Sequence, residues 1–248
     1  MNAVITAGGL VDGDFARTIG TEVKALASLG GSTLLERAVA AARGAGAERI
    51  AVIGGSAVRA QCEREVERVI DAAQDGGENV LRALGAWDTG PLLYLTSDLP
   101  FVTADAVRRF AERSAPFALT MPLASADAYE SCFPQAPEHV VELGGERVAN
   151  GNVFYVAPAA IAPLRIWATR FFAARKSKLG MARLLGPSLH ARFLLGKLTI
   201  GAIERKAQQT LGLSVAAVRD ADPEICFDVD SLEEFNYAQT HLSKGGTR

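Results

Sequence analysis

The first half of the chain repeats one pattern, in which a short apolar run is followed by a stretch with apolar residues at helical spacing. The apolar runs cover residues 3–7, 49–53, 68–71 and 92–96, and the helical stretches cover residues 34–42, 58–69, 80–87 and 104–113. Strands that alternate with helices in this way form a parallel sheet with right-handed crossovers, and helices cover both of its faces. The pattern therefore predicts an α/β fold.

The pattern becomes irregular after residue 115. Residues 116–123, 139–143 and 152–156 predict further strands in a mixed or antiparallel part of the sheet, with a turn at Gly144 and Gly145. Residues 158–213 predict helices that are broken at Pro163, Gly180, Gly186, Pro187 and Gly196. The end of the chain predicts a strand into Asp228 and Asp230 and then a helix from Ser231, with Glu233 and Glu234 in its first turn. We expect one domain over residues 1–248, with residues 158–213 as a helical insertion.

Composition excludes several classes of protein. Of the 248 residues, 49% are apolar and 22% charged, as in ordinary globular proteins. No basic patch precedes an apolar run at the N-terminus, and no window reaches the ~18 apolar residues of a membrane span. Cys62, Cys132 and Cys226 are too few and too far apart to indicate a disulfide framework or a zinc site. These features predict a cytoplasmic protein.

Charge is distributed unevenly although the net charge is only −2. Between residues 158 and 206 there are ten basic residues and one acidic residue, Glu204. Arg170, Phe171, Phe172, Arg175, Lys176 and Lys178 belong to this segment, with Ile166 and Trp167 nearby. The segment is predicted to be a packing or dimerisation element, a lid over an anionic acceptor, or a peripheral contact with an anionic membrane. Nucleic acid is not an expected partner, because the rest of the chain is acidic and the aromatic residues do not alternate with the basic ones.

Candidate ligand-binding residues follow the predicted strands, because ligands of open parallel sheets bind beyond the carboxyl ends of the strands. Gly8 and Gly9 follow the first strand and can aim main-chain N–H groups at a phosphate, although an ordinary strand-end turn fits them too. Arg17 and Lys24 lie in the long connection that follows, where cations could neutralise departing pyrophosphate. The spacing matches neither the dinucleotide fingerprint nor the P-loop.

Asp98 follows the fourth strand in the stretch LLYLTSDLPFVT. A carboxylate at the end of a buried strand is costly unless it has a partner, and a divalent cation bound to phosphates is a suitable one. The alternative is that Asp98 caps the following turn.

Five segments resemble those of MobA-like NTP transferases and occur in the same order. They are TAGG at 6–9, Lys24 ahead of LGGSTLLERAVAAARGAGAERIAVIGG at 29–55, DGGENVLRALGA at 75–86, YLTSDLPFVT at 94–103 and FDVDSLEEF at 227–235. The resemblance covers roughly residues 1–125 and 215–240. It implies a Rossmann-like three-layer sandwich of the GT-A type, with a mostly parallel mixed sheet.

The resemblance also implies roles for individual residues. It assigns nucleotide contacts to Ala7, Gly8, Gly9 and Lys24, base recognition to Gly77 and Asn79, Mg²⁺ binding to Asp98 with Asp230 or Asp228, and acceptor binding to Asn150, Gly151 and Asn152 of the stretch NGNVFYV. Lys24, Asp98 and Arg17 are the implied catalytic residues. Arg17, Gly20 and Lys24 are each spaced one residue wider than in typical members, which indicates a remodelled loop.

The function expected from these residues is Mg²⁺-dependent transfer of a nucleoside monophosphate from an NTP, with CTP and GTP the first candidates, to a small phosphorylated acceptor. His139, His190 and His241 are isolated in the sequence and are expected to be surface or hydrogen-bonded residues, and positioning of two anions requires no enzyme nucleophile. Two alternatives stay open: a non-catalytic nucleotide-binding or regulatory protein on the same scaffold, and a glycosyltransferase that uses a nucleotide sugar.

Overall fold

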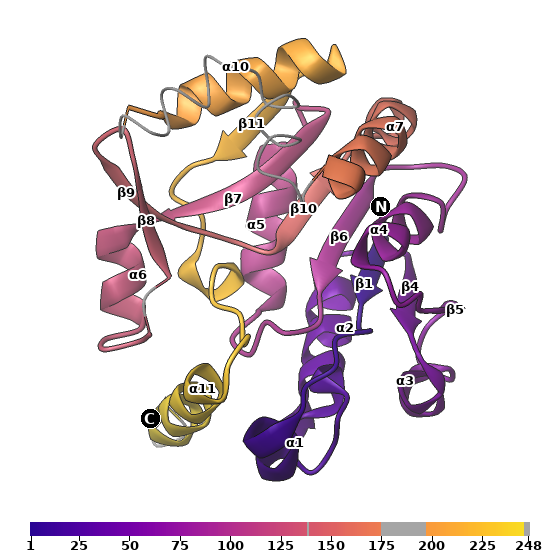
Figure 1. Cartoon of the computed structure of the whole chain (residues 1–248), viewed down its shortest axis with the longest axis vertical. Helices are drawn as coiled ribbons and strands as arrows, with labels where there is room; N and C mark the ends of the chain where they lie inside the picture. The colour runs from indigo at the N-terminus through magenta and orange to yellow at the C-terminus, as the bar shows by residue number, and fades with distance from the viewer. Residues whose placement is uncertain (138, 175–196, 246–248) are drawn as a thin grey trace.

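Within residues 1–137, 139–174 and 197–245, which the computed structural model describes, nine strands form one mixed sheet (Figure 1). The spatial order is β5-β4-β1-β6-β10-β7-β9-β8, with β11 paired to β7. The strands are β1 (Asn2–Thr6), β4 (Arg49–Gly54), β5 (Arg68–Asp71), β6 (Leu92–Thr96), β7 (Leu119–Ser125), β8 (Val140–Leu143), β9 (Glu146–Asn150), β10 (Val153–Val156) and β11 (Val215–Val218). Two short strands, β2 (Ser28–Leu29) and β3 (Ser32–Thr33), form a separate hairpin.

The helices alternate with the strands in the first half of the chain, as the sequence pattern predicts. They are α1 (Gly13–Ile19), α2 (Leu34–Gly44), α3 (Ser56–Cys62), α4 (Gly76–Leu84), α5 (Ala104–Ser114), α6 (Ala126–Cys132), α7 (Pro158–Ala174), α10 (Ile200–Leu211) and α11 (Leu232–Gly245), with 3-10 turns η1 (Lys24–Leu26) and η2 (Pro223–Ile225). Local sequence fixes several helix starts. Thr33 and Glu36 form a capping box at α2, and Asp75 accepts the first N–H groups of α4.

Strands β5, β4, β1 and β6 are parallel, which confirms the α/β prediction for the first half. The other half is mixed: β10 pairs antiparallel with both β6 and β7, while β11 runs parallel to β7. Because β10 reverses direction, the carboxyl ends of β1, β6 and β7 lie at one edge, and the turn before β10 lies there too. This edge positions the candidate site.

Apolar side chains alternate between the two faces of the sheet. Ile5, Val52 and Leu93 pack with the apolar sides of α2, α5 and α11 in one core cluster. Val4, Ile53 and Leu92 face the other way and pack with α4 and α7. Helices therefore cover both faces, as the fold prediction requires. Figure 1 shows that α11 lies beside α1 at the opposite end of the chain, where the rings of Phe15 and Phe235 are 5.8 Å apart.

The structure corrects three predictions about secondary structure and adds one strand that the sequence did not predict. The helix predicted over residues 58–69 ends at Cys62, because β5 takes up the following apolar residues. Residues 227–230 belong to no strand of the sheet, although buried and more exposed residues alternate there as in a strand. Helix α7 continues through Pro163, which was predicted to break it, and buries Ala160 and Ala168 on either side of the proline. Directly after the segment predicted to be helical, residues 215–218 form strand β11.

The basic segment can be described only in part. Arg175, Lys176, Lys178 and His190 lie outside the described residues, as do the predicted breaks at Gly180, Gly186, Pro187 and Gly196. The described parts pack on the sheet: Ala160 of α7 joins the cluster of α4, and Ile200 of α10 packs with Leu123 and Val148. In the described part of the chain, no helix combines the length and apolar character needed to cross a membrane.

Candidate functional site

Three aspartates from two distant segments meet at the carboxyl edge of the sheet. Asp98, Asp228 and Asp230 each offer a carboxylate oxygen, and these oxygens lie within 4.8 Å of one another. We call these three residues the acidic cluster. The geometry brings together the residues that the resemblance nominated for a metal site.

Asp98 is held in place by the strand pairing that precedes it. The N–H of Ser97 donates to the carbonyl of Thr6 at 3.0 Å, which extends the pairing of β6 with β1 by one residue. Leu99 is fully buried on the other side. The Asp98 carboxylate is thereby fixed at the point where the strand ends.

Asp228 and Asp230 are positioned by the residues between and before them. Phe227 and Val229 are fully buried, so the two aspartates that alternate with them point the other way. Phe227 packs edge to face against Phe101 with the ring centroids 5.0 Å apart. The N–H of Val229 donates to the carbonyl of Asp98 at 3.0 Å, which ties this segment to the end of β6.

Lys24 is the cation of the acidic cluster. Its ammonium lies 2.6 Å from Asp98 Oδ2 and 2.7 Å from Asp230 Oδ1. Burial acts to lower the pKa of Lys24, but the charge of Asp98 and the hydrogen bond to Asp230 raise it above its ordinary value overall. Lys24 is placed by its own N–H, which donates to the carbonyl of Gly9 at 3.0 Å. We call the segment with Gly8 and Gly9 that follows β1 the glycine loop. It thus positions Lys24 beside the aspartates.

The acidic cluster carries more negative charge than Lys24 balances. Burial, together with the charges of Asp98 and Asp230, raises the pKa of Asp228 to about 7. Asp98 Oδ1 is buried and has no hydrogen-bond partner among the described residues. A buried carboxylate oxygen without a partner is costly, and an all-oxygen donor set suits Mg²⁺ or a similar hard cation. The residues therefore fit a divalent metal ion.

His139 contacts Asp228 of the acidic cluster, a contact that the sequence did not predict. Its Nδ1 lies 3.6 Å from Asp228 Oδ1, and its Nε2 lies 3.3 Å from Glu234 Oε1. Glu234 also accepts the N–H groups of Asp230 and Ser231, both at 2.6 Å, at the start of α11. His139 stands ahead of β8, and no spacing rule connects it to residues 228–234. His241 contacts the aromatic rings of Phe101 and Tyr237 instead.

The predicted base-recognition residues border the glycine loop. The side chain of Asn79 accepts from the N–H of Ala73 at 2.7 Å and donates to the carbonyl of Ala73 at 3.0 Å. A Cβ on Gly8 would lie 3.0 Å from the Cβ of Ala72, so the two loops are closely packed. Gly77 is buried, and its N–H donates to Asp75 at 2.8 Å. The geometry gives Asn79 a loop-positioning contact next to Gly8.

The predicted acceptor residues lie where β9 turns into β10. The carbonyl of Asn152 accepts from the N–H of Thr96 at 3.2 Å, which places Asn152 beside the strand that leads to Asp98. Thr96 Oγ1 is buried without a hydrogen-bond partner in the described part of the chain. Gly151 packs tightly, since a Cβ there would meet Pro122 at 2.7 Å. Asn150 is exposed at the end of β9.

Arg17 is not brought to the acidic cluster. It lies on α1, its side chain is 73% exposed, and it pairs with Asp14 of the same helix. Asp12 and Glu22 of this loop line a pocket of about 470 Å³ together with Asp230. The bridge between Leu10 and Val23 closes the loop at its base.

The chain is thus an α/β protein whose candidate site lies at the carboxyl ends of its strands, where ligands of open parallel sheets bind. A family model described as the MobA-like NTP transferase domain matches residues 3–186. The chain belongs to this family, and it is therefore a nucleotidyltransferase by family.

Solved structures agree with this assignment. A hypothetical transferase from Thermus thermophilus is 28% identical, with a TM-score of 0.82, and the match covers 94% of this chain and 99% of the other. The 2-C-methyl-D-erythritol 4-phosphate cytidylyltransferase of the same organism is 18% identical, with a TM-score of 0.58 and 98% of each chain covered. Rv0371c of Mycobacterium tuberculosis H37Rv, in complex with manganese, is 16% identical, with a TM-score of 0.55 and coverage of 96% and 97%. No curated protein matches the chain in sequence.

Proposed function

We propose that the protein transfers a nucleoside monophosphate from an NTP to a small phosphorylated acceptor and releases pyrophosphate. The observation that carries this proposal is the meeting of Lys24 with Asp98, Asp228 and Asp230 beside the glycine loop. In the reaction, an acceptor oxygen forms a bond to the α-phosphorus as the bond from that phosphorus to the β-phosphate oxygen breaks. CTP or GTP is the proposed donor, and relatives include a cytidylyltransferase.

The metal-binding role falls to the acidic cluster. We propose that Asp98, Asp228 and Asp230 hold Mg²⁺, and a relative of the same fold was solved with manganese. When bound there, such an ion would supply positive charge next to the phosphates. Asp98 Oδ1, which has no hydrogen-bond partner among the described residues, is the oxygen that gains most from an ion.

The remaining catalytic work in this proposal belongs to the chain itself. Lys24 turns from the aspartates toward the phosphate oxygens and stabilises the charge that develops on pyrophosphate. Main-chain N–H groups near Ala7, Gly8 and Gly9 bind the phosphates, and Asn79 holds the neighbouring loop in position for the base. Asn150, Gly151 and Asn152 are the proposed acceptor residues. Holding two anions in line is sufficient for transfer without an enzyme nucleophile.

Family membership favours an NTP over a nucleotide sugar as the donor, which makes the glycosyltransferase alternative the weaker one. We further propose that residues 1–248 act as one domain, with residues 158–213 as an insertion within it. Arg17, at the exposed surface of α1, is proposed to reach the phosphates only if the loop closes over the nucleotide.

The proposal is tested by pyrophosphate release. The protein is incubated with Mg²⁺, each of the four NTPs in turn and a pool of phosphorylated metabolites, with Asp98→Asn as the matched control. We expect release with one NTP that depends on the pool and on Mg²⁺. If nucleotides bind but no combination releases pyrophosphate, the protein is a non-catalytic nucleotide-binding protein and the proposal is wrong.

A further inference from the structure

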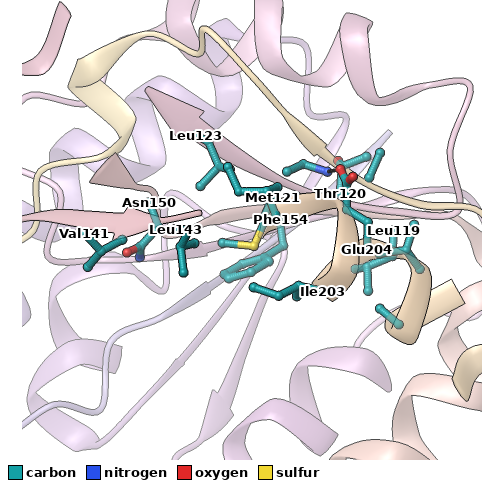
Figure 2. Close-up of a pocket in the computed structure, with 15 residues that line it drawn as sticks. Leu119, Thr120, Met121, Leu123, Val141, Leu143, Asn150, Phe154, Ile203 and Glu204 are labelled. Carbon is teal, nitrogen blue, oxygen red and sulfur yellow. Dashed lines mark hydrogen bonds between the residues drawn. The ribbon is translucent and has the colours of Figure 1, made fainter. Parts of the chain in front are cut away.

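A second pocket, of about 330 Å³, lies on the face of the sheet that α10 covers (Figure 2). Met121 of β7 and Phe154 of β10 form its floor, Ile203 of α10 lies across from them, and Val141 of β8 closes one side. Figure 2 shows Met121 and Phe154 next to each other, with Val141 to the left and Ile203 to the right in this view. We call this the apolar pocket. Its volume is in the range of small-molecule sites.

Some of the polar groups that line the apolar pocket are already paired. Glu204 Oε1 accepts from the N–H of Ala217 at 2.8 Å, and the hydroxyl of Thr120 lies 2.7 Å from that of Ser114. Among the described residues, the side-chain amide of Asn150 and the other carboxylate oxygen of Glu204, Oε2, have no hydrogen-bond partner. The pocket therefore offers a largely apolar surface with few polar atoms, which favours a ligand with an apolar body.

A chain of side-chain contacts links the apolar pocket to the strands that carry the candidate site. Phe154 pairs in register with Tyr94, and their rings meet edge to face at 5.9 Å. The hydroxyl of Tyr94 lies 3.2 Å from that of Thr6, the last residue of β1 before the glycine loop. Asn150, at the edge of the pocket, is two residues from Asn152, whose carbonyl accepts from Thr96. The edge of the apolar pocket at Asn150 and the proposed acceptor residue Asn152 therefore belong to the same connection between β9 and β10.

The opening of the apolar pocket exposes apolar side chains to water. Val141 is 43% exposed and Ile203 is 38% exposed, and both belong to the few large apolar side chains in the described chain with such exposure. They lie on different elements, β8 and α10, on either side of Met121. Exposed apolar groups that converge on a concave site mark a place where an apolar ligand gains by leaving water.

Resting on the proposed function, we propose that the phosphorylated acceptor carries an alkyl or ring group, which the apolar pocket binds. The acceptor's phosphate then lies toward Asn152 and the acidic cluster, and its apolar group lies against Met121 and Phe154. The chain would thus choose its acceptor by the apolar part of the molecule, while the phosphate is common to all candidates.

The test is equilibrium binding of two probes, methyl phosphate and hexyl phosphate, to the whole protein by titration calorimetry. A methylene that is fully removed from water adds about fourfold in affinity. Hexyl phosphate has five more carbons than methyl phosphate, and partial burial worth about twofold for each carbon predicts binding about thirtyfold tighter than that of methyl phosphate. Equal affinities would overturn the proposal. CTP and GTP binding is measured in the same preparation. If neither nucleotide binds, the proposed function fails, whereas the chain-length preference decides the acceptor inference separately.

Two variants locate the preference. Ile203→Asp places a charge at the opening of the apolar pocket, and Ile166→Asp places the same charge on α7, where Ile166 is 59% exposed and outside the pocket. We expect Ile203→Asp to weaken hexyl phosphate binding about tenfold and to leave methyl phosphate binding unchanged, and Ile166→Asp to change neither. A loss that is equal in both variants, or absent in Ile203→Asp, would place the probe elsewhere and overturn the proposal. Val141→Asp repeats the test from β8.

Discussion

The ammonium of Lys24 lies 2.6 Å from a carboxylate oxygen of Asp98, and both side chains are largely buried, at 13% and 14% exposure. This pair joins the glycine loop to the end of β6. Asp228 and Asp230 add two further carboxylates, so one cation faces three acids. The negative charge that Lys24 does not neutralise is the physical reason to expect a divalent cation here. Like charges repel strongly where the dielectric constant is low, and a bound cation removes that repulsion.

Asp98→Asn tests this expectation most directly. The amide keeps the shape of the side chain but removes the charge of the most buried member of the cluster, so we expect transfer activity to fall about a thousandfold and Mg²⁺ affinity to fall with it. Circular dichroism and the unfolding midpoint are expected to show an intact fold. Asp105→Asn, on the exposed start of α5, is the matched control and should leave both quantities unchanged. Near-normal turnover in Asp98→Asn would contradict the metal assignment.

The parallel half of the fold could be predicted from sequence because its strands are buried and its helices have one apolar side. The 3–7 and 92–96 runs coincide with β1 and β6 to within a residue. Helix α1 escaped prediction because it has seven residues, of which Phe15 and Ile19 pack against the core but none is fully buried, so its apolar periodicity covers a single turn. Strand β11 escaped because its four residues are too short to distinguish from part of an apolar helix.

The positions of candidate-site residues could be predicted from the sequence where those residues directly follow a predicted strand. Asp98 follows a buried strand, so its place at the carboxyl edge followed from the fold. The contact between His139 and Asp228 could not be predicted, because it joins residues far apart in the chain through the packing of Phe227. The charge of Arg17 makes it a candidate for phosphate binding in the sequence, yet Arg17 pairs with Asp14 of the same helix, α1. Sequence supplies the charges, and tertiary packing decides which of them meet.

Lys24→Met is expected to change two quantities in opposite directions. Lys24 neutralises Asp98 and Asp230, so its removal should raise the affinity of the protein for Mg²⁺, measured by calorimetry without nucleotide. The same variant loses the cation that stabilises departing pyrophosphate, so kcat should fall about a hundredfold. Lys197→Met, an exposed position, is the control for both measurements. A lysine with a purely structural role would lower stability without raising Mg²⁺ affinity, and that outcome would contradict the proposed role.

Asn79→Asp tests the loop beside the glycine loop. Asn79 donates to the carbonyl of Ala73, and a carboxylate oxygen in that place would face the carbonyl without a proton between them. We expect a loss of about 1–3 kcal/mol in the free energy of unfolding and about a tenfold weaker NTP affinity. Asn236→Asp, on the exposed side of α11, makes the same chemical change and should alter neither the free energy of unfolding nor the NTP affinity. If Asn79→Asp lowers stability but leaves NTP affinity unchanged, this loop takes no part in nucleotide binding and the prediction is wrong.

The raised pKa of Asp228 predicts how stability depends on pH in the absence of metal. Burial is the first cause and the charges of Asp98 and Asp230 the next, and they raise the pKa from 3.8 to about 7 in the folded protein. Between these values the folded chain holds a proton that the unfolded chain has released. The stabilising effect is therefore fully present below pH about 4 and is lost as the pH rises to about 7.

Urea unfolding in EDTA at pH 5 and pH 8 measures this dependence. Asp228→Asn stays neutral at both values, so its free energy of unfolding relative to the unaltered protein should be higher at pH 8 than at pH 5, by up to about 3 kcal/mol. Mg²⁺ at pH 8 should stabilise the unaltered protein more than Asp228→Asn, because the ion binds the ionised carboxylate. A difference between the two proteins that is the same at pH 5 and pH 8 would show that Asp228 ionises normally and would remove the electrostatic basis of the site.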